Sequence, residues 1–470
     1  TSEIFTYLLL NAHSNIAELL LIVSSNMKLL YHPEHYHGDG IEKNFFEGWY
    51  FKTVSNDNNE TFVVIVGIYR APLNTNGNES HAFVMILLYG FDCLYYRYDV
   101  NEFEASSSSD MEFYVKIGDN KFQKSGITLD LPSSRLIKPT DKEYEEYSDL
   151  LVKDWINIIN FKSSNHSNTE SQLVTSPTLK QDLLNNIVRH KFISYSIYGH
   201  ISFDKIVPFS ATYASPSVMG PFAYIPSLEC NHGLLSIDHR SQGNIELTNE
   251  ENKDDFKRII FKNGYGYIEK DWGTDFPQSY IWAQTNSFMN DDGSSIFLSV
   301  ADIPLISSDG LFGKVPFFKN SLPLRFPGRL IIFYHGSTKT TYNFSTYTLS
   351  FVHELNIEMD NLAMQHTNIY VSNIQGYHLE ISIKRRAGRG IPLRAPVKQF
   401  GKMSLRVEES LDAEMSVKLW HKRRYNDEIE NVIFHDKSIN AGLEIVGDVM
   451  WIAEKYKKKS DPIKLEMSKI

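Results

Sequence analysis

The sequence predicts an all-β protein, and three observations support this. Aromatic residues make up 13% of the chain, and rings favour strands. Short apolar or alternating runs, rich in Val, Ile, Phe and Tyr, are separated by turn residues such as Asn and Gly. Asp141–Ile159 differs, because it spaces its apolar residues as a helix does. Many short strands with turn signals indicate barrels or sandwiches, here with a small helical insertion.

The expected strands fall into two series along the chain. In the first half they are Phe45–Val54, Phe62–Tyr69, His81–Tyr89, Leu94–Tyr98, Met111–Ile117, Lys121–Ser125, Ile127–Leu131 and Phe192–Ile206. In the second half they are Leu234–His239, Ile259–Lys262, Tyr265–Lys270, Ser279–Asn286, Ser295–Ala301, Arg329–Tyr334, Lys339–Asn343, Thr346–His353, Asn368–Asn373, Tyr377–Lys384, Gly401–Glu408, Glu414–His421, Ile429–His435 and Ala441–Gly447.

Length and charge bound the class of protein. With 470 residues the chain is long enough for two domains, each with its own core. The net charge of -10 argues against a nucleic-acid partner, which would need a basic face. Two cysteines, Cys93 and Cys230, are too few for a disulfide framework, which favours a reducing, intracellular compartment.

We divide the chain into an N-terminal appendage (1–30), a first β-domain (31–225), a second β-domain (226–455) and a basic tail (456–470). Polar residues interrupt the apolar appendage, so it is a poor membrane span. The lysine-rich end could contact an anionic membrane surface, although a solvated end is the ordinary interpretation. We therefore expect a protein that is soluble or peripheral to a membrane.

The loop His32–Gly40 (HPEHYHGDG) gathers three histidines and two acids, so metal binding has to be weighed. Its histidines lack the i, i+4 helical spacing of a zinc protease site, and Pro33 with two glycines makes the segment a loop. The expectation is a polar loop leading into a strand, with no metal.

The segment Ala211–His239 contains several Pro and Gly residues and reads as a linker between the domains. Glu229 and His232 lie three residues apart near its end. They form either an acid/base pair or a hydrogen-bonded tie between domains, and such ties are the commoner case. Tyr213 and Tyr224 in the same linker are candidates for substrate binding.

Two stretches combine rings with carboxylates. Asn263–Phe288 holds two Trp residues and five other rings around the run Glu269-Lys270-Asp271, and Asn44–Lys52 surrounds Glu47 with aromatics. Strands of this composition suit a lined cavity, where burial can raise the pKa of an acid. Because each half of the chain opens on such a strand, the pattern also suggests an internal duplication.

No metal-ligand spacing, Walker loop, dinucleotide fingerprint or nucleophile elbow occurs in the sequence. The GRG at Gly388–Gly390 lacks the following helix that a phosphate cradle needs. An enzyme with this sequence would therefore work by acid/base and electrostatic means, without a cofactor.

Five segments resemble the tocopherol cyclase family, in the order in which that family carries them. They are FFEGWYFK (Phe45–Lys52), GPFAYIPSLECNHG (Gly220–Gly233), YGYIEKDWGTDFPQSYIWAQTNSF (Tyr265–Phe288), ESL (Glu409–Leu411) and NAGLEIVGD (Asn440–Asp448). The similarity extends from about Leu30 to Met450. More distantly, the WY and KDWG motifs are similar to those of hydroxyneurosporene synthases and lipocalin-like Diels–Alderases. The resemblance implies two lipocalin-like antiparallel barrels with an apolar ligand at their junction.

The chemistry implied by this resemblance is the closure of a chromanol ring from a prenylated hydroquinone. A general acid protonates the prenyl double bond, the phenol oxygen captures the tertiary cation, and a base takes the phenol proton. We predict Asp271 as the acid, with Glu47 second, and place His232 or Glu229 near the phenol. Candidates for binding the substrate and stabilising the cation are the rings of Trp49, Tyr267, Trp272 and Trp282, with Tyr213 and Tyr224.

Simpler roles compete with each of these. Asp271 could hold a barrel mouth closed through an ion pair, and Trp49 and Trp282 are residue types that more often fill a core. Three classes of function therefore stay open: a cofactor-free cyclase, a non-catalytic binding protein for a prenyl lipid or other hydrophobic ligand, and a protein whose junction is packed with side chains.

Overall fold

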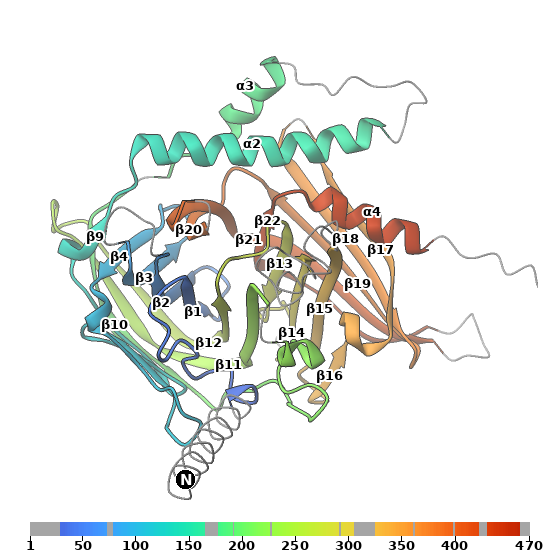
Figure 1. The fold of residues 1–470 in the computed structure, drawn as a ribbon, viewed down its shortest axis with the longest axis horizontal. Helices are drawn as coiled ribbons and strands as arrows, with labels where there is room; N and C mark the ends of the chain where they lie inside the picture. The colour runs from blue at the N-terminus through green and yellow to red at the C-terminus, as the bar shows by residue number, and fades with distance from the viewer. Residues whose placement is uncertain are drawn as a thin grey trace, which may run out of the picture.

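The computed structural model describes residues 29–72, 79–164, 177–190, 192–225, 228–290, 293–304, 325–360, 362–397, 400–422 and 430–460. Strands dominate these residues and form two large antiparallel sheets, shown side by side in Figure 1. The predicted all-β class with a small helical insertion is confirmed. None of the helices in the described part of the chain is long and apolar enough to cross a membrane. The predicted appendage lies almost wholly outside the described residues.

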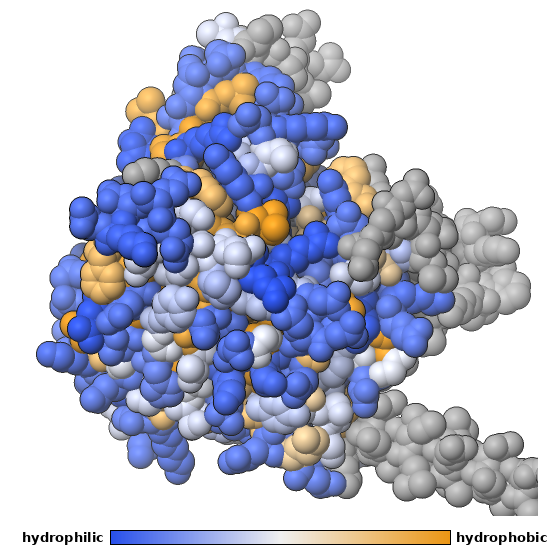
Figure 2. Space-filling view, turned by 90° about the vertical axis from the view of Figure 1, so that its left-hand side faces the viewer, coloured by the Kyte–Doolittle hydropathy of each residue, from blue (hydrophilic) through white to orange (hydrophobic). Residues whose placement is uncertain are grey.

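The first sheet has twelve strands in the order β5-β6-β7-β8-β10-β11-β12-β1-β2-β3-β4-β9. Their bounds are β1 Phe45–Val54, β2 Thr61–Arg70, β3 His81–Leu88, β4 Leu94–Tyr98, β5 Phe103–Ala105, β6 Tyr114–Ile117, β7 Asn120–Gln123, β8 Gly126–Leu131, β9 Leu136–Ile137, β10 Tyr195–Phe203, β11 Cys230–Asn249 and β12 Phe256–Gly273. The sheet curls so that one face of nearly every strand contributes to a single apolar core, which includes Trp49, Phe51, Tyr96 and Phe122. Its outer side is mainly hydrophilic, with scattered hydrophobic residues (Figure 2).

The second sheet has ten strands, nine of them in the order β16-β15-β14-β13-β22-β21-β19-β18-β17, with β20 pairing β21. Their bounds are β13 Tyr280–Thr285, β14 Ser295–Pro304, β15 Arg325–His335, β16 Thr340–Asn343, β17 Ser350–Met359, β18 Met364–Asn373, β19 Tyr377–Arg386, β20 Ile391–Val397, β21 Lys402–Lys422 and β22 Glu430–Val446. The α-helices among the described residues are α2 Asp141–Ser164, α3 Pro177–Asn186 and α4 Val449–Ser460. Buried residues of all three helices join the core on the inner face of this sheet.

Helix α2 crosses above both sheets, as Figure 1 shows, and its contacts tie them together. Near its start the hydroxyl of Tyr144 donates to Asp92, in the connection between β3 and β4. Glu143 pairs with Arg394 of β20 at 2.6 Å. Further along, Trp155 is buried in the core of the second sheet. The predicted helical insertion thus contacts elements of both sheets.

A third apolar cluster fills the junction where the sheets meet. Successive side chains of a strand point to opposite faces of the sheet. On β1 and β12 one face lies in the core of the first sheet and the other faces this junction. On β1, odd-numbered residues such as Trp49 enter the first core and even-numbered residues such as Tyr50 face the junction. On β12 the order is reversed, with Tyr267 at the junction and Ile268 in the first core. Trp282 of β13 faces the junction from the other side.

The expected domain boundary after residue 225 does not separate the sheets. Strands β11 and β12, which follow it, pair with β10 and β1 and belong to the first sheet. The two ring-rich strands are therefore neighbours, with Glu47 opposite Trp272, and not equivalent strands of two duplicated domains. The predicted tail also begins inside α4, where the buried Tyr456 donates its hydroxyl to the carbonyl of Pro327 at 2.8 Å.

A buried ion pair fixes the loop before β1 to the first sheet. The ammonium of Lys270 contacts the carboxylate of Glu47, and both side chains are fully buried. Glu47 also accepts hydrogen bonds from the backbone N–H groups of His37 (2.9 and 3.0 Å) and Gly38 (3.1 Å), and Lys270 donates to the carbonyl of His35. Burial lowers the pKa of Lys270 to about 8, although the charge of Glu47 opposes this shift.

The Lys270→Met substitution should lower the free energy of unfolding by about 3–5 kcal/mol, because it removes the buried cation that balances the charge of Glu47. The double variant Glu47→Gln/Lys270→Met should lose less than the sum of the two single variants. Urea unfolding measures both. Lys257→Met on the same strand is the matched control, since the Lys257–Glu60 pair (3.0 Å) is partly exposed to solvent and worth about 1 kcal/mol or less. Equal losses in the two lysine variants would contradict this account of the buried pair.

Candidate functional site

A pocket with a volume of about 190 Å³ opens at the junction between the two sheets. On the same measure a single water needs only about 10–15 Å³, so this space suits a larger molecule. Most of its wall is apolar, but polar and charged side chains also line it. The apolar residues include Phe46, Phe83, Met85, Phe276, Trp282, Phe326 and Leu393, and the polar residues include Tyr50, His232, Glu269, Asp271, Tyr280, Glu444, Arg329 and Arg394.

His232 on β11 is held between two carboxylates of β12. Its Nδ1 lies 2.7 Å from Oδ1 of Asp271, and its Nε2 lies 3.3 Å from Oε2 of Glu269. Burial alone would lower the pKa of His232, but the charges of Asp271 and Glu269 outweigh it and raise that pKa to about 10. The ring also stacks on Phe297 of the second sheet, at 4.7 Å between centroids. At neutral pH His232 is therefore an imidazolium.

Glu269 joins the two sheets through polar contacts inside the apolar junction. Its Oε2 accepts a hydrogen bond from the hydroxyl of Tyr267 (2.5 Å) and another from Nε1 of Trp282 on β13 (3.2 Å). The predicted residues His232, Tyr267 and Trp282 thus contact one carboxylate, and the predicted Asp271 is linked to them through His232. Asp271 lies at the pocket side of this network, with 25% of its side chain exposed.

Two further carboxyl groups lie at the junction on neighbouring strands of the second sheet. Glu409 of β21 pairs in register with Glu444 of β22. The hydroxyl of Tyr280 donates to Glu444 at 2.7 Å, and that of Tyr50 donates to Glu409 at 2.6 Å. Burial, with the charge of Glu409 adding to it, raises the pKa of Glu444 well above its ordinary value. Burial also raises the pKa of Glu409 to about 8, against the Tyr50 hydrogen bond and the charge of Lys52.

Lys52 of β1 is a cation buried beside these acids. Its ammonium donates to the carbonyl of Asn440 (2.7 Å) and to the side-chain and backbone oxygens of Gln284 (3.2 and 3.4 Å). Burial lowers its pKa to about 7, although the charges of Glu409 and Glu269 act in the opposite direction. The junction therefore holds several ionisable groups in an environment that penalises net charge.

Three other predicted residues lie on the first-core side of their strands, away from this pocket. Glu47 is paired with Lys270, as described above. Trp49 is fully buried and donates from Nε1 to the carbonyl of Glu34 at 2.9 Å. Trp272 stacks on His37 at 4.1 Å between centroids. The contacts of these three residues tie the loop before β1 to the first sheet. Their predicted catalytic and binding roles stay predictions.

The remaining three predicted residues lie in the linker. Tyr213 is 84% exposed, and its carbonyl accepts a hydrogen bond from the hydroxyl of Tyr224 at 2.7 Å. The carbonyl of Glu229 accepts the backbone N–H groups of Thr274 (2.8 Å) and Asp275 (3.2 Å). None of these three side chains lines the junction pocket within the described residues, whereas Met219, Phe222 and Leu228 of the same linker do. Their predicted roles also stay predictions.

Sequence reasoning did not single out Glu409, Glu444, Tyr50 or Tyr280. A signal was present for the two acids, because both lie inside segments that carry the family resemblance, ESL and NAGLEIVGD. The neighbouring Glu408 shows why the sequence alone does not identify which glutamate faces the junction. It faces the second core, where it pairs with Arg385 (3.3 Å) and accepts the backbone N–H groups of Gly388 and Gly390.

No protein-family model matches the chain. Among solved structures it is similar to CghA with Sch210972, at a TM-score of 0.39 and 7% identity, over 86% of this chain and 89% of that one. A second CghA structure matches at 0.39 and 8% identity, with the same coverage. The Nitrosomonas europaea protein NE1406, described as an ATTH, matches at 0.40 and 9% identity, over 88% of this chain and 94% of that one. At these TM-scores the likeness does not extend any activity to this chain.

Histidine NMR should show His232 still protonated at pH 8, while His81 and His239 are neutral. Burial lowers the pKa of His81 to about 4 and that of His239 to about 3, so both serve as internal references. The folded pKa of His232 lies above the unfolded value of about 6.5. Its stabilising contribution is therefore complete below pH about 6.5 and is lost as the pH rises through about 10.

The variant His232→Gln assigns the signal, and Asp271→Asn should move the titration of His232 to lower pH because it removes the larger of the two attractive charges. A His232 signal that titrates near the ordinary value in the wild-type protein would contradict the ion-pair geometry.

Proposed function

We propose that this chain is a cofactor-free, cyclase-like enzyme that protonates a hydrophobic substrate in the junction pocket. One observation carries the proposal: Glu444 presents a carboxyl group with a raised pKa to an apolar pocket. A carboxylic acid kept neutral by its site is available as a general acid at neutral pH. A pocket that only held an apolar ligand would have no need of buried carboxyl groups, since each costs free energy to desolvate.

The surroundings of Glu444 suit proton donation. The Tyr280 hydroxyl holds Oε2, which leaves the other oxygen to carry the proton. Rings of Phe46, Phe276 and Trp282 line the same pocket. Each ring over a developing cation stabilises it by about 0.5–2 kcal/mol. The exclusion of water also strengthens these interactions and prevents water from capturing the cation.

The reaction class that fits best is the cyclisation of a prenylated hydroquinone to a chromanol. Glu444 gives its proton to one carbon of the trisubstituted double bond, so a C–H bond forms and a tertiary cation appears. The phenol oxygen attacks the cation and forms the new C–O bond. Asp271 receives the phenol proton, and solvent returns one proton to Glu444 as Asp271 loses one. The sum is an isomerisation that needs no oxidant or cofactor.

This proposal moves the acid from Asp271, the sequence-based choice, to Glu444. Asp271 already pairs with His232 at 2.7 Å, so we assign it the role of proton acceptor. A carboxylate at the pocket wall is suited to accept a proton. The imidazolium of His232 holds it in place and balances its charge, and Glu269 positions His232 from the other ring nitrogen. The substrate would therefore lie with its phenol toward Asp271 and its double bond toward Glu444.

The test is turnover of prenylated hydroquinones in heavy water, with products separated by chromatography and analysed by mass spectrometry. The wild-type protein should give a cyclised product with one deuterium on carbon. Glu444→Gln keeps the shape of the side chain but lowers its acidity, so the rate should fall by roughly 10²–10⁴-fold. The exposed Glu414→Gln on β21 is the matched control and should leave the rate unchanged.

Retention of a hydroquinone through gel filtration separates the two ligand-based functions. Loss of turnover in Glu444→Gln with retention unchanged supports the proposal. Retention without turnover by the wild-type protein would contradict it and favour a carrier of hydrophobic molecules. Full activity in Glu444→Gln would exclude Glu444 as the acid.

A further inference from the structure

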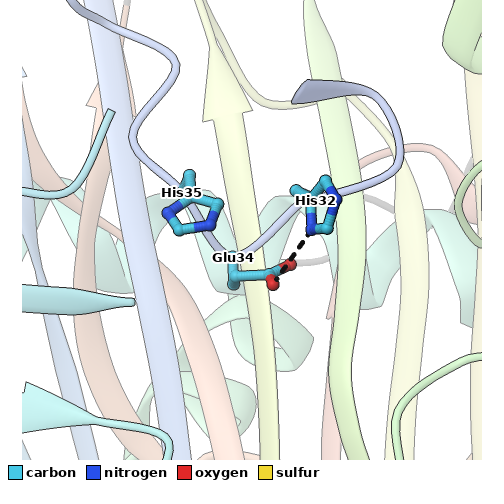
Figure 3. Close-up of side chains that lie close together, drawn as sticks. All are labelled: His32, Glu34 and His35. Atoms are coloured by element: carbon cyan, nitrogen blue, oxygen red, sulfur yellow. Dashed lines mark hydrogen bonds and ion pairs between the residues drawn. The ribbon is translucent and has the colours of Figure 1, made fainter. Parts of the chain in front are cut away.

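The loop before β1 contains a second group of chemically capable side chains, distinct from the junction pocket. His32, Glu34 and His35 each offer one ligand atom, and these atoms all lie within 4.8 Å of one another. Figure 3 shows the three side chains gathered along one short loop. His32 Nδ1 lies 3.5 Å from Oε1 of Glu34. Two imidazoles and one carboxylate form a donor set that suits Zn²⁺ and similar divalent transition metals.

Two features show that this loop is held in a defined conformation. His35 is buried, and its Nδ1 lies 2.9 Å from Oγ of the fully buried Ser106. Metal-binding histidines are oriented in this way, with one ring nitrogen fixed by a second group. The backbone is anchored as well, because the carbonyl of Glu34 accepts from Trp49 and the carbonyl of His35 accepts from Lys270. The ligands are therefore preorganised.

A positive side chain competes for the same carboxylate. Nζ of Lys124, in the turn between β7 and β8, lies 2.6 Å from Oε1 of Glu34. Lys124 is half exposed, so its ammonium can move into solvent when another cation takes the carboxylate. His32 is 43% exposed and leaves the site open to solvent. A divalent ion and the lysine would then be alternative partners of Glu34.

We propose that His32, Glu34 and His35 form a binding site for a divalent transition-metal ion of the Zn²⁺ type, which displaces Lys124 from Glu34. This proposal departs from the sequence-based expectation of a polar loop without metal. The same loop supplies the backbone groups that hold Glu47 and Lys270, so the ion would stabilise the attachment of this loop to β1 and β12. The proposal is independent of the proposed cyclase activity, since none of the three ligands lines the junction pocket.

The test is titration of the tag-free full chain with Zn²⁺ by calorimetry, and with Co²⁺ by absorption spectroscopy. The wild-type protein should bind one ion per chain and gain thermal stability with Zn²⁺. His35→Ala should weaken binding at least tenfold, and Ser106→Ala should weaken it by roughly tenfold through the lost orientation of the ring. His366→Ala, an exposed histidine of the second sheet, is the matched control and should bind as the wild type does.

Lys124→Met should change the Zn²⁺ affinity in the opposite direction, toward tighter binding, which damage to the loop would not produce. Removing the competing ammonium should tighten Zn²⁺ binding by roughly tenfold, because Glu34 is then free for the ion. Circular dichroism of each variant checks that the chain is folded. Absence of wild-type binding would overturn the proposal. So would equal affinity in His35→Ala, or weaker binding in folded Lys124→Met.

Discussion

The carboxylate of Glu269 is the contact on which the arrangement of the site depends. It accepts hydrogen bonds from Tyr267 in the first sheet and Trp282 in the second, and it pairs with His232. A carboxylate is stable in a buried place only when other groups donate hydrogen bonds to it. The need to keep these donors within reach restricts how the two sheets can pack against each other at the junction. The same network leaves Asp271 at the pocket wall. The hydrogen bonds and the ion pair of this buried carboxylate therefore constrain both the packing of the sheets and the shape of the pocket.

Charge balance explains why acids can accumulate at this junction. Glu269 and Asp271 share one cation, the imidazolium of His232, whereas Glu409 and Glu444 have raised pKa values because burial disfavours their charged forms. Full ionisation of all these groups would place several like charges in a low-dielectric region. The structure thus separates two kinds of carboxyl group. Those paired with a cation are suited to accept protons, and those kept neutral are suited to donate them.

The sequence predicted the strands well but could not say which face of each strand meets the ligand. Strand β1 was placed correctly at Phe45–Val54, and its alternation was readable. Trp49 and Tyr50 are equally good binding candidates from sequence, yet only Tyr50 faces the junction, because β1 packs between two different apolar regions. Glu409 and Glu444 could not be chosen because their pairing joins distant segments whose register is a tertiary property. Asp271 was found because it lies in a stretch that combines rings with carboxylates, and His232 because it lies near Glu229 at the end of the predicted linker.

The central claim is that Glu444 is a neutral carboxylic acid inside a folded protein at neutral pH. Infrared difference spectroscopy tests it directly, by comparing the protonated carboxyl band of the wild-type protein with that of Glu444→Gln between pH 6 and pH 9. The account predicts a protonated carboxyl band at pH 7 that loses the Glu444 component in Glu444→Gln, retains the component of Glu409, and is unchanged in the exposed control Glu414→Gln. A wild-type spectrum at pH 7 in which the Glu444 signal is that of a carboxylate would contradict the account.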